Sequence, residues 1–290
     1  MIISIVNHTR GKLNDEDIQV GIRAINRQIA HDFEPYWSLG GALRLEGRSE
    51  DTPDKLRLPD LRGDAVIYLW DQVDVDDAIG YHDLNARGIP FGFVFTEISK
   101  ELGESWTVTL SHEALELIGD AQVNLLVMGP HPQNKQQTVF HWYEMCDAVQ
   151  DEHYKVDGID VSNFLLPLYF TNDPEPGGRN DFLGRMYHGH ALESFGINPG
   201  GYIGFFNPET KEHETFSRKS DARARKRLEI KGKAAITRRS LRYQYGSEKV
   251  EEAATVARRA ARGRAGAVAA APGAPAPAYE IIAASKERKE

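Results

Sequence analysis

The sequence predicts an α+β fold in which a mixed β-sheet packs on a long helix near the N-terminus and on a second helix over residues 105–118. Isoleucines recur at helical spacing over residues 18–29, which indicates an amphipathic helix. Apolar β-type runs at 65–70 and 91–96 are bounded by turn residues and predict strands. The 290 residues, 41% of them hydrophobic, suffice for a substantial core.

The remaining elements follow from caps and breakers. Asn14 can cap the first helix, which we expect to reach about residue 30, and Ser105 can cap the second, which Gly119 ends. Further strands are expected at residues 2–6 and 42–45, near 123–128, within 154–170 with a turn at Asp157 and Gly158, and in a closing hairpin of 200–206 with 214–216; another element of unassigned type spans 138–146.

Charge divides the chain into two predicted parts. Residues 218–290 hold 19 Lys and Arg against 8 Asp and Glu, which leaves 16 against 35 for residues 1–217. We therefore expect a folded acidic domain at 1–217 and a flexible basic, Ala/Pro-rich tail or linker at 218–290. Such asymmetry suggests an anionic partner for residues 218–264, either DNA or an acidic protein surface.

Composition limits the location and the chemistry. We find no apolar stretch of membrane-spanning length and no signal-peptide pattern, so a cytoplasmic and possibly virion-associated protein with no membrane partner is expected. Cys146 is the only cysteine, so an internal disulfide and a cysteine-pair zinc site are excluded. A bound metal would depend on His and carboxylate ligands, which suit zinc, with manganese and calcium as alternatives.

The second helix carries the pattern that points to chemistry. His112 and Glu116 stand one helical turn apart and share a face, where they can bind one metal ion. Glu113, about 100° round the helix, is placed to take a proton from metal-bound water. The opposite face is apolar and is expected to pack on the core. This spacing follows the logic of His-Glu-x-x-His, with Glu in place of the second His.

A third ligand is expected from farther along the chain, and Glu144 is the first candidate. Asp147, one turn after it if the segment is helical, can bond the free ring nitrogen of His112. Asp120 lies one turn beyond Glu116 and can support the site from outside. The competing third ligands are, in order, Asp120, His141, and the pair His188 and His190.

At these residues the chain resembles the zincin metalloprotease superfamily, in particular an uncharacterised bacterial and phage branch with a gluzincin-type arrangement. The resemblance covers roughly residues 1–206 and rests on the order of several short matches. They are Gln28, Asp32-Phe33, Pro35-Tyr36-Trp37, Gly80-Tyr81-His82-Asp83, Thr109-Leu110-Ser111-His112-Glu113-Ala114-Leu115-Glu116, Glu144, Cys146-Asp147, Val161-Ser162-Asn163-Phe164 and Pro199-Gly200-Gly201-Tyr202.

The resemblance implies a zinc-dependent peptidase that acts on a peptide or protein. His112, Glu116 and Glu144 would bind the metal, and Glu113 would be the general base. Tyr202, Tyr143 and His188 are the candidate hydrogen-bond donors to the oxyanion, and we assign Tyr202 to the catalytic residues. The strand at 91–96 would be the edge that pairs with substrate. Glu116 departs from the familiar motif, which bears on both the metal and turnover.

Other features of the sequence allow different interpretations. The acidic run from Asp71 to Asp77 could suggest calcium, but a solvated loop is favoured because the EF-hand pattern is missing. His82 and Asp83 are interpreted as a turn rather than a pair near the site. The alternative function is a catalytically inactive zincin-like assembly protein, possibly phage-associated, whose basic tail binds DNA or a partner protein. A metal-free carboxylate hydrolase is least favoured because it leaves His112 without a role.

Overall fold

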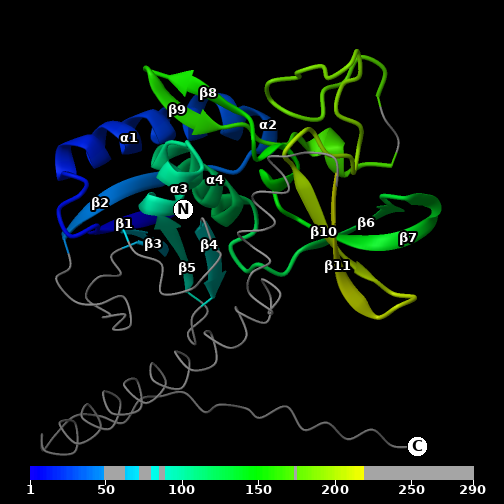
Figure 1. Cartoon of the computed structure of the whole chain (residues 1–290), viewed down its shortest axis with the longest axis horizontal. Helices are drawn as coiled ribbons and strands as arrows, with labels where there is room; N and C mark the ends of the chain where they lie inside the picture. The colour runs from blue at the N-terminus through cyan, green and yellow to red at the C-terminus, as the bar shows by residue number, and fades with distance from the viewer. Residues whose placement is uncertain (49–62, 72–79, 85–88, 173–174, 219–290) are drawn as a thin grey trace, which may run out of the picture.

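The computed structural model describes residues 1–48, 63–71, 80–84, 89–172 and 175–218 (Figure 1). Most of the predicted basic tail therefore lies outside the described residues, as does most of the acidic run that follows Asp71. Among the described residues, no helix has both the length and the apolar character that a membrane span requires. The described part of the chain is α+β, as predicted.

The first half of the chain forms a five-stranded sheet and the helices that cover it. Its elements are β1 (Ile2–His8), α1 (Asp15–Gln28), a π-helical turn (Ile29–Phe33), α2 (Glu34–Trp37), β2 (Ala42–Arg48), β3 (Ala65–Trp70), β4 (Gly80–Leu84), β5 (Pro90–Phe95), α3 (Thr96–Glu101) and α4 (Trp106–Gly119). The strand order is β2-β1-β3-β5-β4, and β4 is antiparallel to its neighbour while the other pairs are parallel.

The second half adds two smaller sheets. Its elements are β6 (Leu126–His131), β7 (Asn134–Trp142), a 3-10 turn (Asp147–Val149), β8 (His153–Val156), β9 (Ile159–Ser162), a second 3-10 turn (Pro167–Phe170), β10 (Tyr202–Asn207) and β11 (Glu212–Ser217). One sheet has the order β11-β10-β7-β6, and β8 with β9 forms a hairpin that turns at Asp157 and Gly158, as predicted.

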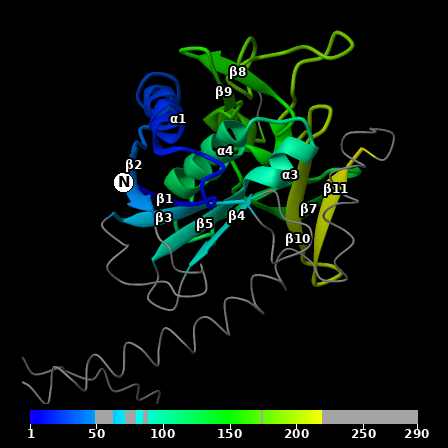
Figure 2. The same ribbon diagram turned by 60° about the vertical axis from the view of Figure 1, so that its left-hand side comes forward.

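The two long helices lie on one face of the five-stranded sheet (Figure 2). The Asn14 side chain accepts the Asp17 N–H at 2.7 Å and so caps α1 as predicted, while Ile18, Ile22 and Ile25 face the core. Ser105 caps α4 through the Thr107 N–H. Burial of the apolar side chains on both helices stabilises this layer at about 25 cal/mol per Å² of apolar area removed from water.

A buried hydrogen-bonded triangle locks α4 against α1 and β9. The Ser111 hydroxyl donates to Gln28 Oε1 at 2.6 Å and accepts the Ser162 N–H at 3.1 Å, and the Gln28 amide donates to the Ser162 carbonyl at 2.7 Å. Gly21 allows α1 and α4 to approach, because a Cβ there would lie 2.8 Å from the Trp106 ring. The orientation of the face of α4 that carries His112 is thereby set by polar contacts on its other side.

Two expectations about the sheet are wrong. The strand at 91–96 is β5, and it lies between β3 and β4 rather than at an edge. His82, expected in a turn, lies inside the edge strand β4, where its register partner is Gly92. β4 (Gly80–Leu84) pairs with the outer side of β5 and bonds its backbone groups. The apolar run of β5 does not by itself reveal this non-local pairing.

A close contact joins the second sheet to the segment that carries the predicted acidic residues. A Cβ on Gly201 would lie 2.1 Å from the Ala148 carbonyl oxygen, so only glycine allows the backbone to pass there. Gly200, with a φ of +81°, adopts the left-handed conformation just before it. β10 can therefore pack on the 3-10 turn of Asp147.

Candidate metal centre

Six titratable side chains from three separate parts of the chain meet at the polar face of α4. His82 comes from β4, and His112, Glu113 and Glu116 come from α4. Glu144 and Asp147 follow β7. The side chains are almost closed off from solvent: His82 is 1% exposed, Glu113 3%, Glu116 0% and Asp147 3%, while His112 at 12% and Glu144 at 15% are the most open.

His112 and Glu116 face each other, as the helical spacing predicts. Nε2 of His112 lies 3.2 Å from Glu116 Oε1 and 3.3 Å from Asp147 Oδ1. Burial alone would lower the pKa of His112, but the two carboxylates outweigh that effect and raise the pKa well above its ordinary value. Asp147 therefore contacts the His112 ring, as expected, although through the nitrogen that also faces Glu116.

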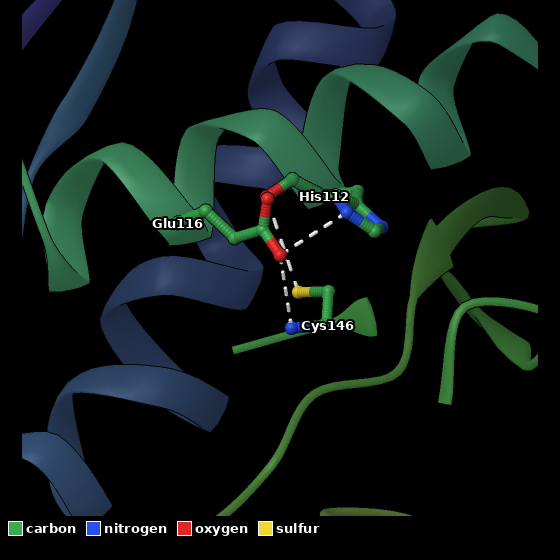
Figure 3. A group of neighbouring side chains, drawn as sticks. All are labelled: His112, Glu116 and Cys146. Carbon is green, nitrogen blue, oxygen red and sulfur yellow. Dashed lines mark hydrogen bonds and ion pairs between the residues drawn. The ribbon is translucent and has the colours of Figure 1, made fainter. Parts of the chain in front are cut away.

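Glu116 stands at the centre of the group. Figure 3 shows its carboxylate between the His112 ring and the backbone of Cys146, whose N–H donates to Oε1 at 3.3 Å. The Cys146 thiol points toward the His112 carbonyl oxygen, 3.9 Å away. Burial raises the pKa of Glu116 to about 7, against the opposing attraction of His112. Burial likewise raises the pKa of the Cys146 thiol well above its ordinary value.

His82 is the site residue that sequence analysis assigned to a turn. Its Nδ1 lies 2.9 Å from Glu113 Oε2 and 3.6 Å from Glu116 Oε2, and its Nε2 lies 3.9 Å from Glu144 Oε2. Burial lowers the pKa of His82, but the hydrogen bond to Glu113 and the charge of Glu144 reverse the effect and raise it. Glu113 is thus hydrogen-bonded to an imidazole.

The predicted ligand set is divided between two groups. Within the described residues, the side chains of His82, Glu116 and Glu144 offer ligand atoms within 4.8 Å of one another, and so do His112, Glu116 and Cys146. Glu116 belongs to both, but His112 and Glu144 are not in the same group. Because the Cys146 thiol already donates to the His112 carbonyl oxygen, the first group, with one nitrogen and two carboxylates, is the better cation site.

Two buried atoms in this first group test whether a cation fits. In the described part of the chain, neither His82 Nε2 nor Glu116 Oε2 has a hydrogen-bond partner. A buried polar atom without a partner costs about 1–3 kcal/mol, and more when the group is charged. A lone pair on nitrogen and a carboxylate oxygen are both ligand atoms for a divalent ion, so the residues fit a metal.

Glu144 reaches the cluster from an extended segment. The segment is not helical, so Asp147 does not follow Glu144 by one helical turn: residues 134–142 form β7, and the chain then continues without helical structure to the 3-10 turn at Asp147. Pairing with β6 on one side and β10 on the other decides this, and neither partner is visible from local spacing. Glu144 and Asp147 nevertheless both face α4.

The remaining candidates have other surroundings. Asp120 follows the end of α4 and its carboxylate accepts the Leu125 N–H at 2.8 Å, a role in joining the helix to β6. His141 is a core residue of β7: its Nε2 bonds the Pro130 carbonyl oxygen, and burial lowers its pKa to about 4. His188 and His190 line a separate cavity of about 280 Å³ and do not belong to either ligand group.

The two tyrosine candidates and Asp71 are also buried or packed against other side chains. Tyr143 packs on Trp37 and Phe170, and burial raises its pKa to about 12. Tyr202 is buried at the start of β10, which packs on the 3-10 turn of Asp147. Asp71, expected in a solvated loop, is fully buried and pairs with Arg10 and Lys12, so a solvated position for it is wrong.

Comparison of the chain with family models, with curated proteins and with solved structures found no match. The fold and the side-chain geometry therefore carry the argument about function.

Proposed function

We propose that the protein binds a divalent cation through His82, Glu116 and Glu144 and hydrolyses peptide bonds with it. The observation that carries this proposal is the pair of buried atoms, His82 Nε2 and Glu116 Oε2, which have no hydrogen-bond partner among the described residues. Glu144, beside His82 and more open to solvent, completes a set of nitrogen and oxygen ligands. Zinc suits this set best, with manganese as the alternative.

The balance of charge in the cluster supports the same conclusion. Four carboxylates, Glu113, Glu116, Glu144 and Asp147, face two imidazoles. The six side chains keep an excess of negative charge even when both imidazoles are protonated. Buried charge of one sign is costly unless it is compensated, either by protons taken up by the carboxylates or by a cation. A divalent ion would reduce the excess at neutral pH.

His82 is prepared for the role of ligand by Glu113. The hydrogen bond from Nδ1 to the Glu113 carboxylate selects the tautomer whose Nε2 carries the lone pair. Metal-bound histidines commonly have their other nitrogen held by a carboxylate in this way. When bound, the ion would polarise the carbonyl group of a substrate and make bound water more acidic. Glu113 then has two possible tasks, to hold His82 or to accept the proton.

A Glu113→Gln variant separates these two tasks. The amide oxygen of glutamine still accepts a hydrogen bond from His82 Nδ1, but the side chain no longer accepts a proton. If Glu113 is the base, the variant keeps its metal and loses about 10²–10⁴-fold in kcat on a peptide library. Activity close to that of the wild type would restrict Glu113 to holding His82.

The ligand set is tested by the metal content of the purified full-length protein. We expect about one zinc or manganese ion per chain in the wild type and in His112→Ala, and a large loss in His82→Ala and Glu144→Ala. Metal retained in His82→Ala but lost in His112→Ala would refute this set and favour the other group. If the purified wild type contains no metal and cleaves no peptide after zinc is added, the proposed hydrolase function is refuted.

The enclosure of the site favours one other candidate function. Structural metal sites are closed by protein ligands, whereas catalytic ones keep an open coordination position. His82 and Glu116 are almost completely buried, which suits a protein that an ion stabilises without catalysis. In that case the protein keeps its metal and gains stability from it, but cleaves no peptide. Assembly or DNA binding through residues 218–264 stays a prediction.

A further inference from the structure

The outer edge of β6 offers a second feature beside the metal centre. Within the part of the chain that the structure describes, β6 is the last strand of the four-stranded sheet and pairs with β7 on one side only. An edge strand presents backbone donors and acceptors in an extended row, which another extended chain can satisfy.

The pairing pattern shows which backbone groups face outward. The Tyr143 N–H donates to the Leu125 carbonyl oxygen at 3.2 Å, and the register places these two residues opposite each other. In an antiparallel ladder, residues that bond the partner strand alternate with residues that do not. The N–H and C=O groups of Leu126 and Met128 therefore point away from β7. Pro130 comes next in this alternation, and there its missing N–H costs no bond to β7.

The side chains along this edge are apolar and accessible. Leu126 is 42% exposed and Met128 58%. Their partners across the ladder are Trp142 and Phe140, which lie on the same face of the sheet, and Phe206 continues the row on β10. An added strand would thus lay alternate side chains beside a row of large apolar groups.

One end of this edge adjoins the metal centre. The Leu125 N–H donates to the carboxylate of Asp120, one turn past Glu116 on α4. On the other strand, Tyr143 is bonded to Leu125 and is followed directly by Glu144, the most exposed of the proposed ligands. A peptide strand that pairs with Leu126 would therefore have one end near Glu144.

We propose that β6 binds an extended peptide as an added strand, with large apolar side chains at alternate positions, and delivers it to the metal centre. This inference rests on the proposed function, because the peptide is the substrate. A second copy of the chain is a poorer occupant. Only Leu126 and Met128 offer both outward backbone groups before Pro130, whereas a stable interface needs about 1,200 Å² or more of buried surface. A short ladder suits a ligand that is bound briefly.

Proline at position 128 tests the backbone contact. Met128→Pro removes one outward N–H and leaves the bonds to β7, as Pro130 does already, while Met128→Ala removes the same side chain and keeps the N–H. The probe is a short fluorescent peptide of alternating Leu and Ser, added to full-length, EDTA-treated protein. We expect Met128→Pro to bind it about tenfold more weakly than Met128→Ala, the effect of one lost hydrogen bond. Equal affinity of the two variants would overturn the proposal.

A scan of N-methylated peptides gives a second readout that does not depend on any variant folding. Methylation should abolish binding at every second amide and be tolerated between them, because only alternate amides face β6. Uniform loss or uniform tolerance would overturn the proposal. So would a wild-type dimer that Met128→Pro dissociates, since a second copy would then occupy the edge.

The two proposals fail in different ways. If N-methylation blocks binding at every second amide but the protein holds no metal, the β6 docking proposal stands and the hydrolase proposal is refuted. Metal-dependent cleavage with the same kcat/KM in Met128→Pro and Met128→Ala would retain the hydrolase and remove the docking edge.

Discussion

The cation-free protein should lose stability as the pH rises, and Glu116 should be a main cause. Burial raises the pKa of this carboxyl group to about 7 from an ordinary value of 4.5. A group whose pKa is higher in the folded state stabilises the fold fully below its unfolded value, and the contribution is lost as the pH rises through the folded value. Between 4.5 and about 7 the difference amounts to about 3 kcal/mol. The raised pKa of His112 acts in the same direction.

Glu116→Gln should remove most of this dependence. Glutamine keeps the shape of the side chain and an oxygen that accepts the Cys146 N–H, but it carries no charge at any pH. We expect urea denaturation of the EDTA-treated wild type to give a free energy of unfolding about 3 kcal/mol lower at pH 8 than at pH 4.5. The variant should vary less and be the more stable of the two at pH 8.

Asp71→Asn is the matched control, because it makes the same chemical change in a fully buried carboxylate that is paired with Arg10 and Lys12. It should destabilise the protein, since two cations lose their partner. Zinc added at pH 8 should restore the wild type, because the ion takes the place of the protons, and should do little for Glu116→Gln. A cation-free wild type as stable at pH 8 as at pH 4.5, or a less stable Glu116→Gln at pH 8, would refute this reasoning.

Two further predictions concern the framework of the site. Ser111→Ala leaves the Ser162 N–H and the Gln28 amide oxygen buried without their partner, so urea denaturation should show a loss of about 1–3 kcal/mol; an unchanged midpoint would mean that the triangle does not hold α4. Gly201→Ala places a Cβ 2.1 Å from the Ala148 carbonyl oxygen and should lower the melting temperature by an amount that corresponds to about 1–3 kcal/mol, whereas a neutral effect would contradict the close approach.

The elements of the fold that depend on local signals were predictable. Asn14 and Ser105 cap the two helices as expected, and the isoleucine periodicity of α1 identifies its buried face. The strands at 65–70 and 91–96 were found for the same reason, since apolar β-type residues bounded by turns are a local pattern. The order of the strands is not local, and the edge position assigned to 91–96 failed because β4 pairs outside it.

The site was predictable as far as one helix extends. Helical spacing alone brought His112 and Glu116 together, and the acidic pair Glu144 and Asp147 was found because a metal needs further ligands. His82 was missed because it lies on β4, 31 residues before Glu113 on α4. The available signal was chemical: a buried Glu113 needs a partner, and His82 with its neighbouring apolar strand was a candidate. Nothing in the sequence indicated that Cys146 would contact Glu116 and His112.

The most direct test of the central claim is the position of the ion in a crystal of the zinc-loaded protein, measured by anomalous scattering at the zinc edge. The proposal predicts a single peak about 2.0–2.2 Å from His82 Nε2 and from a carboxylate oxygen of both Glu116 and Glu144. A peak on His112 and Cys146 instead, or no peak within this cluster, would contradict it.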